Sequence, residues 1–281
     1  MLALFDSPDT FLVRYHRHHT GITSWALSRG RARGDLSSYD LLAELVPSQT
    51  PHKVVDLGCG DGYLIERLLA RGVPTERIVG IDISPDELML ARKRSGLDYV
   101  AMLCERADRT TLPNDSTGYV LSHMSFMVLS KIEDVVAEIA RILIPGGVFS
   151  VVVPSEAEPD GAAAAFFELF NEIYHSQATR APVLGDPRTW TEAGLRGLLR
   201  YESQFDGLEF THIDLCLDGT VTEVWNSLSA RYEAYVILPQ HRAQLRDRFM
   251  ERARQLARSD GTIPCTLPLC QLVCRRANAK N

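Results

Sequence analysis

Glycines follow the first predicted strand in a spacing that brings bare backbone close to a ligand. The segment Val54–Gly62 runs from apolar residues through Asp56 into glycines at positions 58, 60 and 62. A strand that leads into a glycine-rich turn and then a helix lets main-chain N–H groups approach a bound molecule. A dinucleotide site requires G-x-G-x-x-G, whereas here the third glycine comes one position earlier and Tyr63 follows it. The turn therefore indicates a ligand without a pyrophosphate, such as one with an amino-acid moiety.

Carboxylates end the second and third predicted strands. Asp82 lies at the end of the strand Arg77–Ile83, 22 residues after Gly60, where a carboxylate can accept hydrogen bonds from the two hydroxyls of a ribose. Asp108 follows the strand Tyr99–Ala107 and can accept from an exocyclic adenine amine. The turn and both carboxylates occur in chain order at consecutive strand ends. This order favours an adenosyl ligand over the alternative, a structural turn beside two surface carboxylates.

An alternation of strands and helices positions these strand ends. Five short apolar stretches are predicted strands: Lys53–Leu57, Arg77–Ile83, Tyr99–Ala107, Gly118–His123 and Val148–Val153. Helical spacing between them predicts a parallel sheet with helices on both faces, whose ligands bind at the carboxyl ends of the strands. After Pro154 the pattern changes. We expect helices at 162–177, Thr189–Tyr201 and 221–258 (broken at Pro239), and strands at Leu208–Leu217 and Thr266–Arg276.

Helix-start signals support the predicted alternation of strands and helices. Ser37 and Ser130 each have an acidic residue three positions later, which is the spacing of a capping box. Ser84 precedes a proline and Glu87, an order typical of a helix N-terminus. Residues 1–36 are expected to be irregular.

Composition excludes several classes of protein. A single core can serve a chain of 281 residues, and 45% hydrophobic with 23% charged residues is typical of a globular protein. The formal net charge of −6 argues against a nucleic-acid partner, because such proteins carry a basic face. The apolar stretch Ile142–Val153 is interrupted by Pro145 and two glycines, so we expect no membrane span, and the N-terminus has no secretory signal. A cytoplasmic protein is expected.

Two clusters contain residue types that can bind a metal ion. Cys265, Cys270 and Cys274 lie close together, but no C-x-x-C motif is present and no histidine is near them in sequence. The second group is the polar and aromatic run Arg14–His19. Free thiols and a surface histidine cluster are the favoured interpretations, so we expect no metal.

The sequence resembles the class I S-adenosylmethionine-dependent methyltransferases over about residues 37–154. The matching segments are Val54–Gly62, Val79–Ser84, Ala107–Asp108 before Leu112-Pro113, and Arg141–Val148. The resemblance implies an α/β, doubly wound, seven-stranded and mostly parallel sheet whose last strand is antiparallel, with helical lid insertions. The expected single methyltransferase domain, 1–281, has an N-terminal cap segment (1–36), a cofactor-binding core (37–154), lid insertions (155–190 and 221–258) and a closing strand (262–276).

The resemblance also implies roles for individual residues toward S-adenosylmethionine. Asp56 and the 58–62 loop would hold the methionine end, Asp82 the ribose, and Ile83 and Asp108 the adenine. An N-terminal segment can close over the cofactor in this family, which adds Tyr15 and Arg14. The expected cofactor-binding residues are Arg14, Tyr15, Asp56, Gly58, Cys59, Gly60, Asp61, Asp82, Ile83, Ala107, Asp108, Ser122 and His123.

Substrate groups are expected around the end of the fourth strand. The methyl group is already activated on a sulfonium, so orientation for in-line displacement is the main catalytic effect, on the order of 7–11 kcal/mol in favourable cases. His123 is the candidate base, with packing beside the cofactor as the alternative. Ser122–Ser125 departs from the Asn/Asp-Pro-Pro-aromatic tetrad of nucleobase and glutamine N-methylating branches, which disfavours those targets. The expected substrate residues are His18, His19, Ser125, Phe126, Trp225 and Tyr232.

The leading hypothesis is methyl transfer to an O or N atom of a small molecule. The alternatives are an RNA or protein substrate, or a protein of this fold that binds the cofactor without transferring a methyl group. Tyr63 disfavours a nicotinamide dehydrogenase. A homodimer is an open alternative to a monomer.

Overall fold

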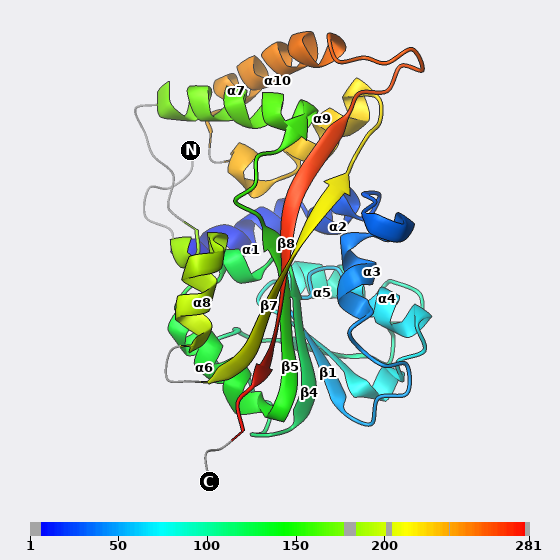
Figure 1. Cartoon of the computed structure of the whole chain (residues 1–281), viewed down its shortest axis with the longest axis vertical. Coiled ribbons are helices and arrows are strands. Elements are labelled where there is room, and N and C mark those ends of the chain that lie inside the picture. The colour runs from blue at the N-terminus through cyan, green and yellow to red at the C-terminus, as the bar shows by residue number, and fades with distance from the viewer. Residues whose placement is uncertain (1–6, 177–183, 201–203, 236, 279–281) are drawn as a thin grey trace.

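A twisted, mostly parallel sheet forms the centre of the molecule in the computed structural model, which describes residues 7–176, 184–200, 204–235 and 237–278 (Figure 1). The strands are β1 (Lys53–Leu57), β2 (Ile78–Asp82), β3 (Ala101–Cys104), β4 (Thr117–His123), β5 (Leu143–Pro154), β6 (Asp160–Gly161), β7 (Phe205–Cys216) and β8 (Cys265–Arg276). Their order is β3-β2-β1-β4-β5-β8, with β6 and β7 both paired to β8. Strands β1 to β5 run parallel, and β8 runs antiparallel to β5, β6 and β7. The predicted α/β class and antiparallel closing strand are confirmed, and the two-residue β6 makes the sheet eight-stranded.

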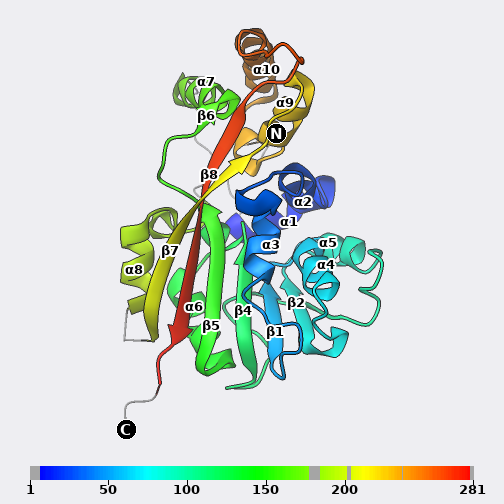
Figure 2. The same cartoon turned by 45° about the vertical axis from the view of Figure 1, so that its right-hand side comes forward.

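Helices cover both faces of this sheet. They are α1 (Pro8–His18), α2 (Ile22–Leu27), α3 (Ser38–Ala43), α4 (Tyr63–Ala70), α5 (Pro85–Ala91), α6 (Ile132–Ile142), α7 (Ala162–Ser176), α8 (Glu192–Arg200), α9 (Val221–Ser229) and α10 (Pro239–Arg254). Helices α3, α4 and α5 pack in one apolar core, and α6 and α8 pack in the other (Figure 2). Alternate residues of β4 face the two cores, with Leu121 in the first and Val120 in the second. Burial on both faces explains why the parallel strands are predominantly apolar.

Two of the three predicted helix starts have the expected capping contacts. Ser37 Oγ accepts a hydrogen bond from the backbone N–H of Asp40 at 3.1 Å, and the Asp40 carboxylate accepts from the Ser37 N–H at 3.0 Å. Ser84 Oγ caps α5 by accepting from the Glu87 N–H at 3.3 Å. The capping box at Ser130 is wrong. Helix α6 begins later, after a left-handed Lys131, because Ser130 Oγ is engaged with Asp9 at 2.8 Å.

The prediction that residues 1–36 are irregular is also wrong, since this segment contains α1 and α2. Ser7 Oγ caps α1 through the Thr10 N–H at 3.2 Å, and Pro8 occupies the first helical position. The same Ser-Pro-Asp order begins α5, so the signal was present in the sequence. Helix α1 buries Phe11, Leu12 and Tyr15 against the rest of the protein.

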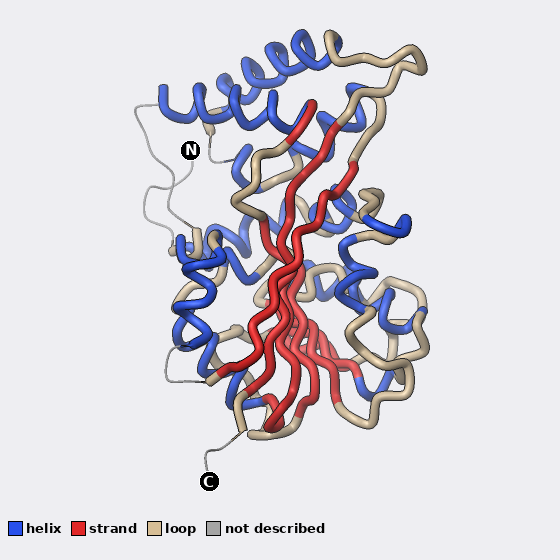
Figure 3. The backbone as a smooth tube through the Cα atoms, in the orientation of Figure 1, coloured by secondary structure: helices blue, strands red, loops and turns tan. Residues whose placement is uncertain are grey.

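Strands β7 and β8 extend well beyond their neighbours and carry a separate layer of helices. Figures 1 and 3 show α7, α9 and α10 at the far end of these two paired strands, with α1 and α2 between that layer and the rest of the sheet. The layer has its own aromatic packing: the Trp225 ring lies 5.4 Å from Phe249 and 6.0 Å from Phe166. The predicted insertions 155–190 and 221–258 supply these three helices, and their movement as lids stays a prediction. In the described ranges, every helix is too short or too polar to cross a lipid bilayer.

Candidate cofactor and substrate site

A cleft opens at the carboxyl ends of β1, β2 and β4, beside the point where the strand order reverses between β1 and β4. It consists of two adjoining pockets with empty volumes of about 970 and 640 Å³, open mouths included. We call the larger the inner pocket and the smaller the side pocket. Both are lined by Leu12, His16, Gly58, Asp82, Ser125 and Val128. This is the edge at which open α/β sheets bind ligands, and the volumes suit a ligand of cofactor size.

The glycine turn after β1 is held against β2 by backbone hydrogen bonds. The N–H groups of Gly58 and Cys59 both donate to the Ile81 carbonyl, at 2.7 and 3.0 Å. Gly58 has a φ of +74°, and a Cβ atom there would lie 2.2 Å from Ser125 Oγ. Gly60 also has a positive φ, +51°, and lines the inner pocket. Glycine is therefore required at position 58 by conformation and by space.

Asp82 is fixed by the backbone on both sides. Its Oδ2 accepts from the Gly60 N–H and its Oδ1 from the Ser84 N–H, each at 2.8 Å. Each carboxylate oxygen keeps a second lone pair that can accept from a hydroxyl. Burial raises the pKa of Asp82, and the two N–H donors and His16 oppose that rise. The carboxylate is thus pre-oriented toward both pockets, which it lines.

Acidic side chains line the inner pocket. Asp56 is 1% exposed, and its Oδ2 has no hydrogen-bond partner among the described residues. Burial, followed by the nearby Asp82 and Asp61 carboxylates, raises the pKa of Asp56 well above its usual value. Asp61, by contrast, is engaged: its carboxylate accepts from Arg94 and from Ser24 Oγ. An unpartnered buried carboxyl oxygen at the base of a pocket suits a ligand that brings a cation or a donor.

Glu87 and His16 also line the inner pocket, although neither is among the site residues predicted from the sequence. The Glu87 carboxylate accepts from the Gly21 N–H at 3.0 Å and pairs with His16 Nδ1 at 2.7 Å. Burial opposes protonation of His16, but the hydrogen bond and charge of Glu87 outweigh it and raise the His16 pKa. The sequence pattern predicts only that Glu87 lies at the start of a helix. Its second role depends on α1 and α2 folding over the cleft, and local sequence spacing carries no signal for that.

Ile83, Ala107 and Asp108 all line the side pocket, as their positions at strand ends indicated. The Asp108 carboxylate accepts from Arg106 Nε at 2.7 Å, and Lys131 Nζ lies 3.5 Å away. Burial would raise the pKa of Asp108, but Arg106 outweighs it and the pKa is lowered. Arg106 also pairs with Asp9 of α1, which ties that helix across the mouth of the pocket.

His123 lines the inner pocket from the end of β4. Its Nε2 lies 2.9 Å from Ser38 Oγ, its ring stacks on Tyr39 at 3.6 Å, and its Nδ1 has no partner in the described part of the chain. Burial lowers the pKa of His123 to about 3, so the ring is neutral at pH 7 and a weak proton acceptor. Its role as a base stays a prediction, and the geometry favours the alternative of packing beside the cofactor.

Ser122 and Ser125 lie beside the glycine turn that follows β1. Ser125 Oγ donates to the Leu57 carbonyl at 2.9 Å and lies 2.6 Å from Ser122 Oγ. Ser125 lines both pockets, whereas Ser122 is completely buried and lines neither. Ser122 therefore reaches the pockets through its contact with Ser125, and its predicted contact with a cofactor stays a prediction. Cys59, Gly60 and Asp61 line the inner pocket directly.

The outer residues divide into two groups. Tyr15 and Tyr232 line the inner pocket, and the Tyr15 hydroxyl donates to the Ala230 carbonyl at 2.6 Å, which joins α1 to the helical layer. Five other predicted residues line neither pocket: Arg14, His18, His19, Phe126 and Trp225.

Four of these five are predicted substrate residues, and the structure places them away from both pockets. Phe126 is fully buried and packs 5.4 Å from Phe149, because the chain after β4 turns into the core. Trp225 faces the aromatic packing of the helical layer. His18 is exposed at the end of α1. The His19 ring lies 4.2 Å from the Tyr235 ring.

Residues 55–151 match the family model described as a methyltransferase domain. Over 120 residues the chain is 39% identical to a trans-aconitate 2-methyltransferase of Methylobacterium nodulans, covering 42% of this chain and 44% of that protein. It is 30% identical over 98 residues to a malonyl-[acyl-carrier protein] O-methyltransferase of Methylococcus capsulatus, covering 34% and 35%. The chain spans about half the length of the first curated relatives it matches, with 44%, 59% and 56% of them covered.

Among solved structures, the fold is similar to that of a Haemonchus contortus phosphoethanolamine N-methyltransferase complexed with phosphomonomethylethanolamine and S-adenosylhomocysteine. The TM-score is 0.58 at 16% identity, over 98% of this chain and 61% of that one. A likeness at this identity establishes the fold and not the substrate.

Proposed function

We propose that this chain, whose residues 55–151 match the methyltransferase-domain model, transfers the methyl group of S-adenosylmethionine to an O or N atom of a small molecule. The observation that carries the proposal is the joining of the glycine turn, the fixed Asp82 and the unpartnered Asp56 oxygen in one continuous cleft. The cofactor named in the solved neighbour's complex is of the same adenosyl class.

The residues of the cleft fit this cofactor along its length. The ammonium and sulfonium of S-adenosylmethionine are cationic, and the inner pocket is lined by the carboxylates of Asp56, Asp61, Asp82 and Glu87. Asp82 would accept from the ribose hydroxyls, next to the pocket that holds Ile83 and Asp108 for the adenine. When bound, the cofactor supplies a methyl group that a nucleophile can displace from the positive sulfur.

This chain's own part in the reaction is to bind, orient and exclude water. Helix α1 contributes Leu12 and His16 to the walls of both pockets, and Tyr232, just after α9, adds to the wall of the inner pocket. Enclosure of this kind holds an acceptor atom in line with the methyl group, which is the largest contribution available to a reaction with an activated donor. The same enclosure favours a small acceptor over an RNA or protein, because walls formed by the chain itself limit the size of the molecule that can reach the methyl group.

The names of the relatives guide the choice of acceptors. Trans-aconitate and malonyl-acyl carrier protein, which appear in those names, are both acids, and Arg231 lines the inner pocket. We therefore place small carboxylic acids first among the acceptors to test and amines second. A cytoplasmic location and a homodimer stay predictions.

The test has two stages. Calorimetry with S-adenosylhomocysteine is expected to show binding at micromolar concentration, and failure to bind would refute the cofactor assignment. Cell extract and a panel of acids and amines are then incubated with the protein and isotope-labelled methyl donor, and products are identified by mass spectrometry. A labelled small molecule is expected. Label in RNA or protein would refute the substrate class, and cofactor binding without any labelled product would favour the non-transferring alternative.

A further inference from the structure

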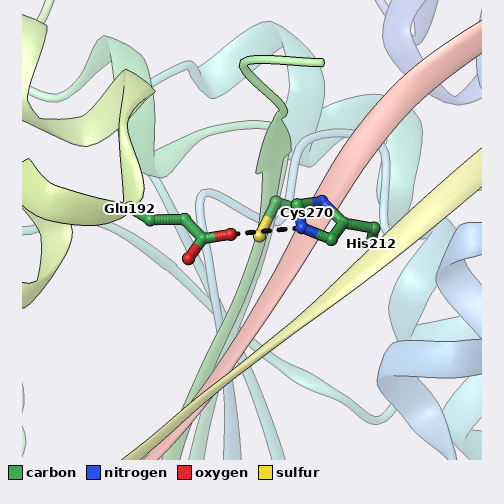
Figure 4. A group of neighbouring side chains, drawn as sticks. All are labelled: Glu192, His212 and Cys270. Carbon is green, nitrogen blue, oxygen red and sulfur yellow. Dashed lines mark ion pairs between the residues drawn. The ribbon is translucent and has the colours of Figure 1, made fainter.

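Three side chains able to bind a metal ion converge outside the cofactor cleft, in the part of the chain that the structure describes. Glu192 is the first residue of α8, His212 lies in β7 and Cys270 lies in β8 (Figure 4). One donor atom from each lies within 4.8 Å of both of the others. His212 and Cys270 are direct partners in the β7–β8 ladder, so their side chains project from the same face of the sheet.

The surroundings combine a shielded thiol with accessible outer ligands. Cys270 is 3% exposed, whereas the side chains of His212 and Glu192 are 65% and 35% exposed. All three line a surface pocket with an empty volume of about 340 Å³, which Glu156 also lines. Glu156 is positioned at the rim by accepting a hydrogen bond from the Glu192 N–H at 3.1 Å. An ion could therefore enter from solvent and reach the buried sulfur.

We propose that Glu192, His212 and Cys270 form a binding site for a divalent transition-metal ion of the Zn²⁺ type. Thiolate, imidazole and carboxylate are the donors that zinc takes in proteins, most often in a tetrahedral set. Bond lengths of about 2.0–2.3 Å place tetrahedral donors about 3.3–3.8 Å apart. His212 Nε2 and Glu192 Oε1 are already 3.3 Å apart. The exposed ends of these two side chains can rotate to close the remaining gap to the sulfur.

Binding exchanges one proton for the metal ion. The S–H bond of Cys270 breaks, the proton leaves to solvent, and the sulfur lone pair forms the bond to the metal. Burial, followed by the Glu192 and Glu156 carboxylates, raises the pKa of Cys270 to about 11. The same two carboxylates that disfavour a bare thiolate favour a divalent cation beside it. Glu156 or a water molecule completes the fourth position.

A metal ion here would join three segments that are distant in the sequence. Helix α8 packs on β7, and the paired strands β7 and β8 carry the helical layer at their far end (Figure 1). An ion bound by Glu192, His212 and Cys270 would link the start of α8 to both β7 and β8. The inference does not rest on the proposed methyl transfer, because no residue of this site lines the cofactor pockets.

Cobalt provides a direct test, since Co²⁺ replaces Zn²⁺ and absorbs light. The full chain, stripped with a chelator, is titrated with Co²⁺. We expect one equivalent to produce the near-ultraviolet band of thiolate-to-cobalt charge transfer and visible bands of tetrahedral intensity, and Zn²⁺ to abolish both. Cys270→Ser should lose the charge-transfer band, and His212→Ala should weaken cobalt binding at least tenfold. No band in the wild-type chain, or an unchanged band in Cys270→Ser, would overturn the proposal.

Matched controls separate the site from general effects. Cys274→Ser removes a buried cysteine four residues along β8 and should leave the cobalt spectrum unchanged. His175→Ala removes an exposed histidine of α7 and should leave the affinity unchanged. If Cys270→Ser does not fold, the surface variants His212→Ala and Glu192→Gln decide the question. Binding of S-adenosylhomocysteine is measured in the same samples, so failure of the metal site is distinguishable from failure of the proposed function.

Discussion

Removal of the Asp82 carboxylate tests the cofactor assignment most directly. Asp82 receives backbone N–H donors from Gly60 and Ser84, both at 2.8 Å, and we propose that it also accepts from the ribose hydroxyls. A hydrogen bond to a charged group contributes about 1.5–3 kcal/mol. Loss of one such bond in Asp82→Ala should raise the dissociation constant of S-adenosylhomocysteine about ten- to one-hundred-fold, and loss of two should raise it further.

The assay must distinguish a lost ribose contact from a collapsed turn, because Asp82 also holds Gly60. Calorimetry is therefore run on wild type and Asp82→Ala with S-adenosylhomocysteine and with an analogue that lacks both ribose hydroxyls. The penalty of the substitution should largely disappear with the analogue. Asp98→Asn, at an exposed position, is the control variant. Equal penalties with both ligands, or no penalty with either, would refute the ribose assignment.

Three further predictions concern the walls of the cleft. Gly58→Ala should lower the melting temperature more than Gly146→Ala, because both have a φ near +75° but only position 58 meets an atom, Ser125 Oγ at 2.2 Å; equal losses would show that the contact is unimportant. The raised His16 pKa gives a stabilising contribution that is complete below the unfolded value of 6.5 and is lost as the pH rises through the folded value. Thermal unfolding against pH should show this loss in wild type but not in Glu87→Gln, and identical profiles would contradict the pairing. Because the pKa of His123 is about 3, the kcat/KM profile of His123→Gln should keep its shape between pH 6 and pH 9; loss of a limb near neutrality would restore His123 as the base.

Local patterns were enough to predict the core of the sheet and the first layer of the site. The turn at 58–62 and the strand that ends in Asp82 depend on short-range chemistry: glycine where φ is positive, and β-branched apolar residues where both faces are covered. Parallel strands then bring their carboxyl ends to one edge whatever else the chain does. The position of Asp82 next to the turn followed from that rule alone.

The walls of the cleft depended on contacts between distant segments. Helix α1 was predictable from its Ser-Pro-Asp start, but its place over the pockets depends on Asp9 meeting Arg106 and on His16 meeting Glu87. Phe126 and Trp225 show the same limit, because an aromatic residue near a strand end or on an apolar helix face fits a pocket wall and a core equally well.

The sequence by itself therefore determined which strand ends carry the chemistry, since strand and turn formation is decided by neighbouring residues. Only the tertiary structure decided what closes over those ends and what else comes together. His212 and Cys270 are 58 residues apart and become neighbours through the register of β7 on β8. That register joins two strands that have helices α9 and α10 between them in the chain, so no local spacing encodes it.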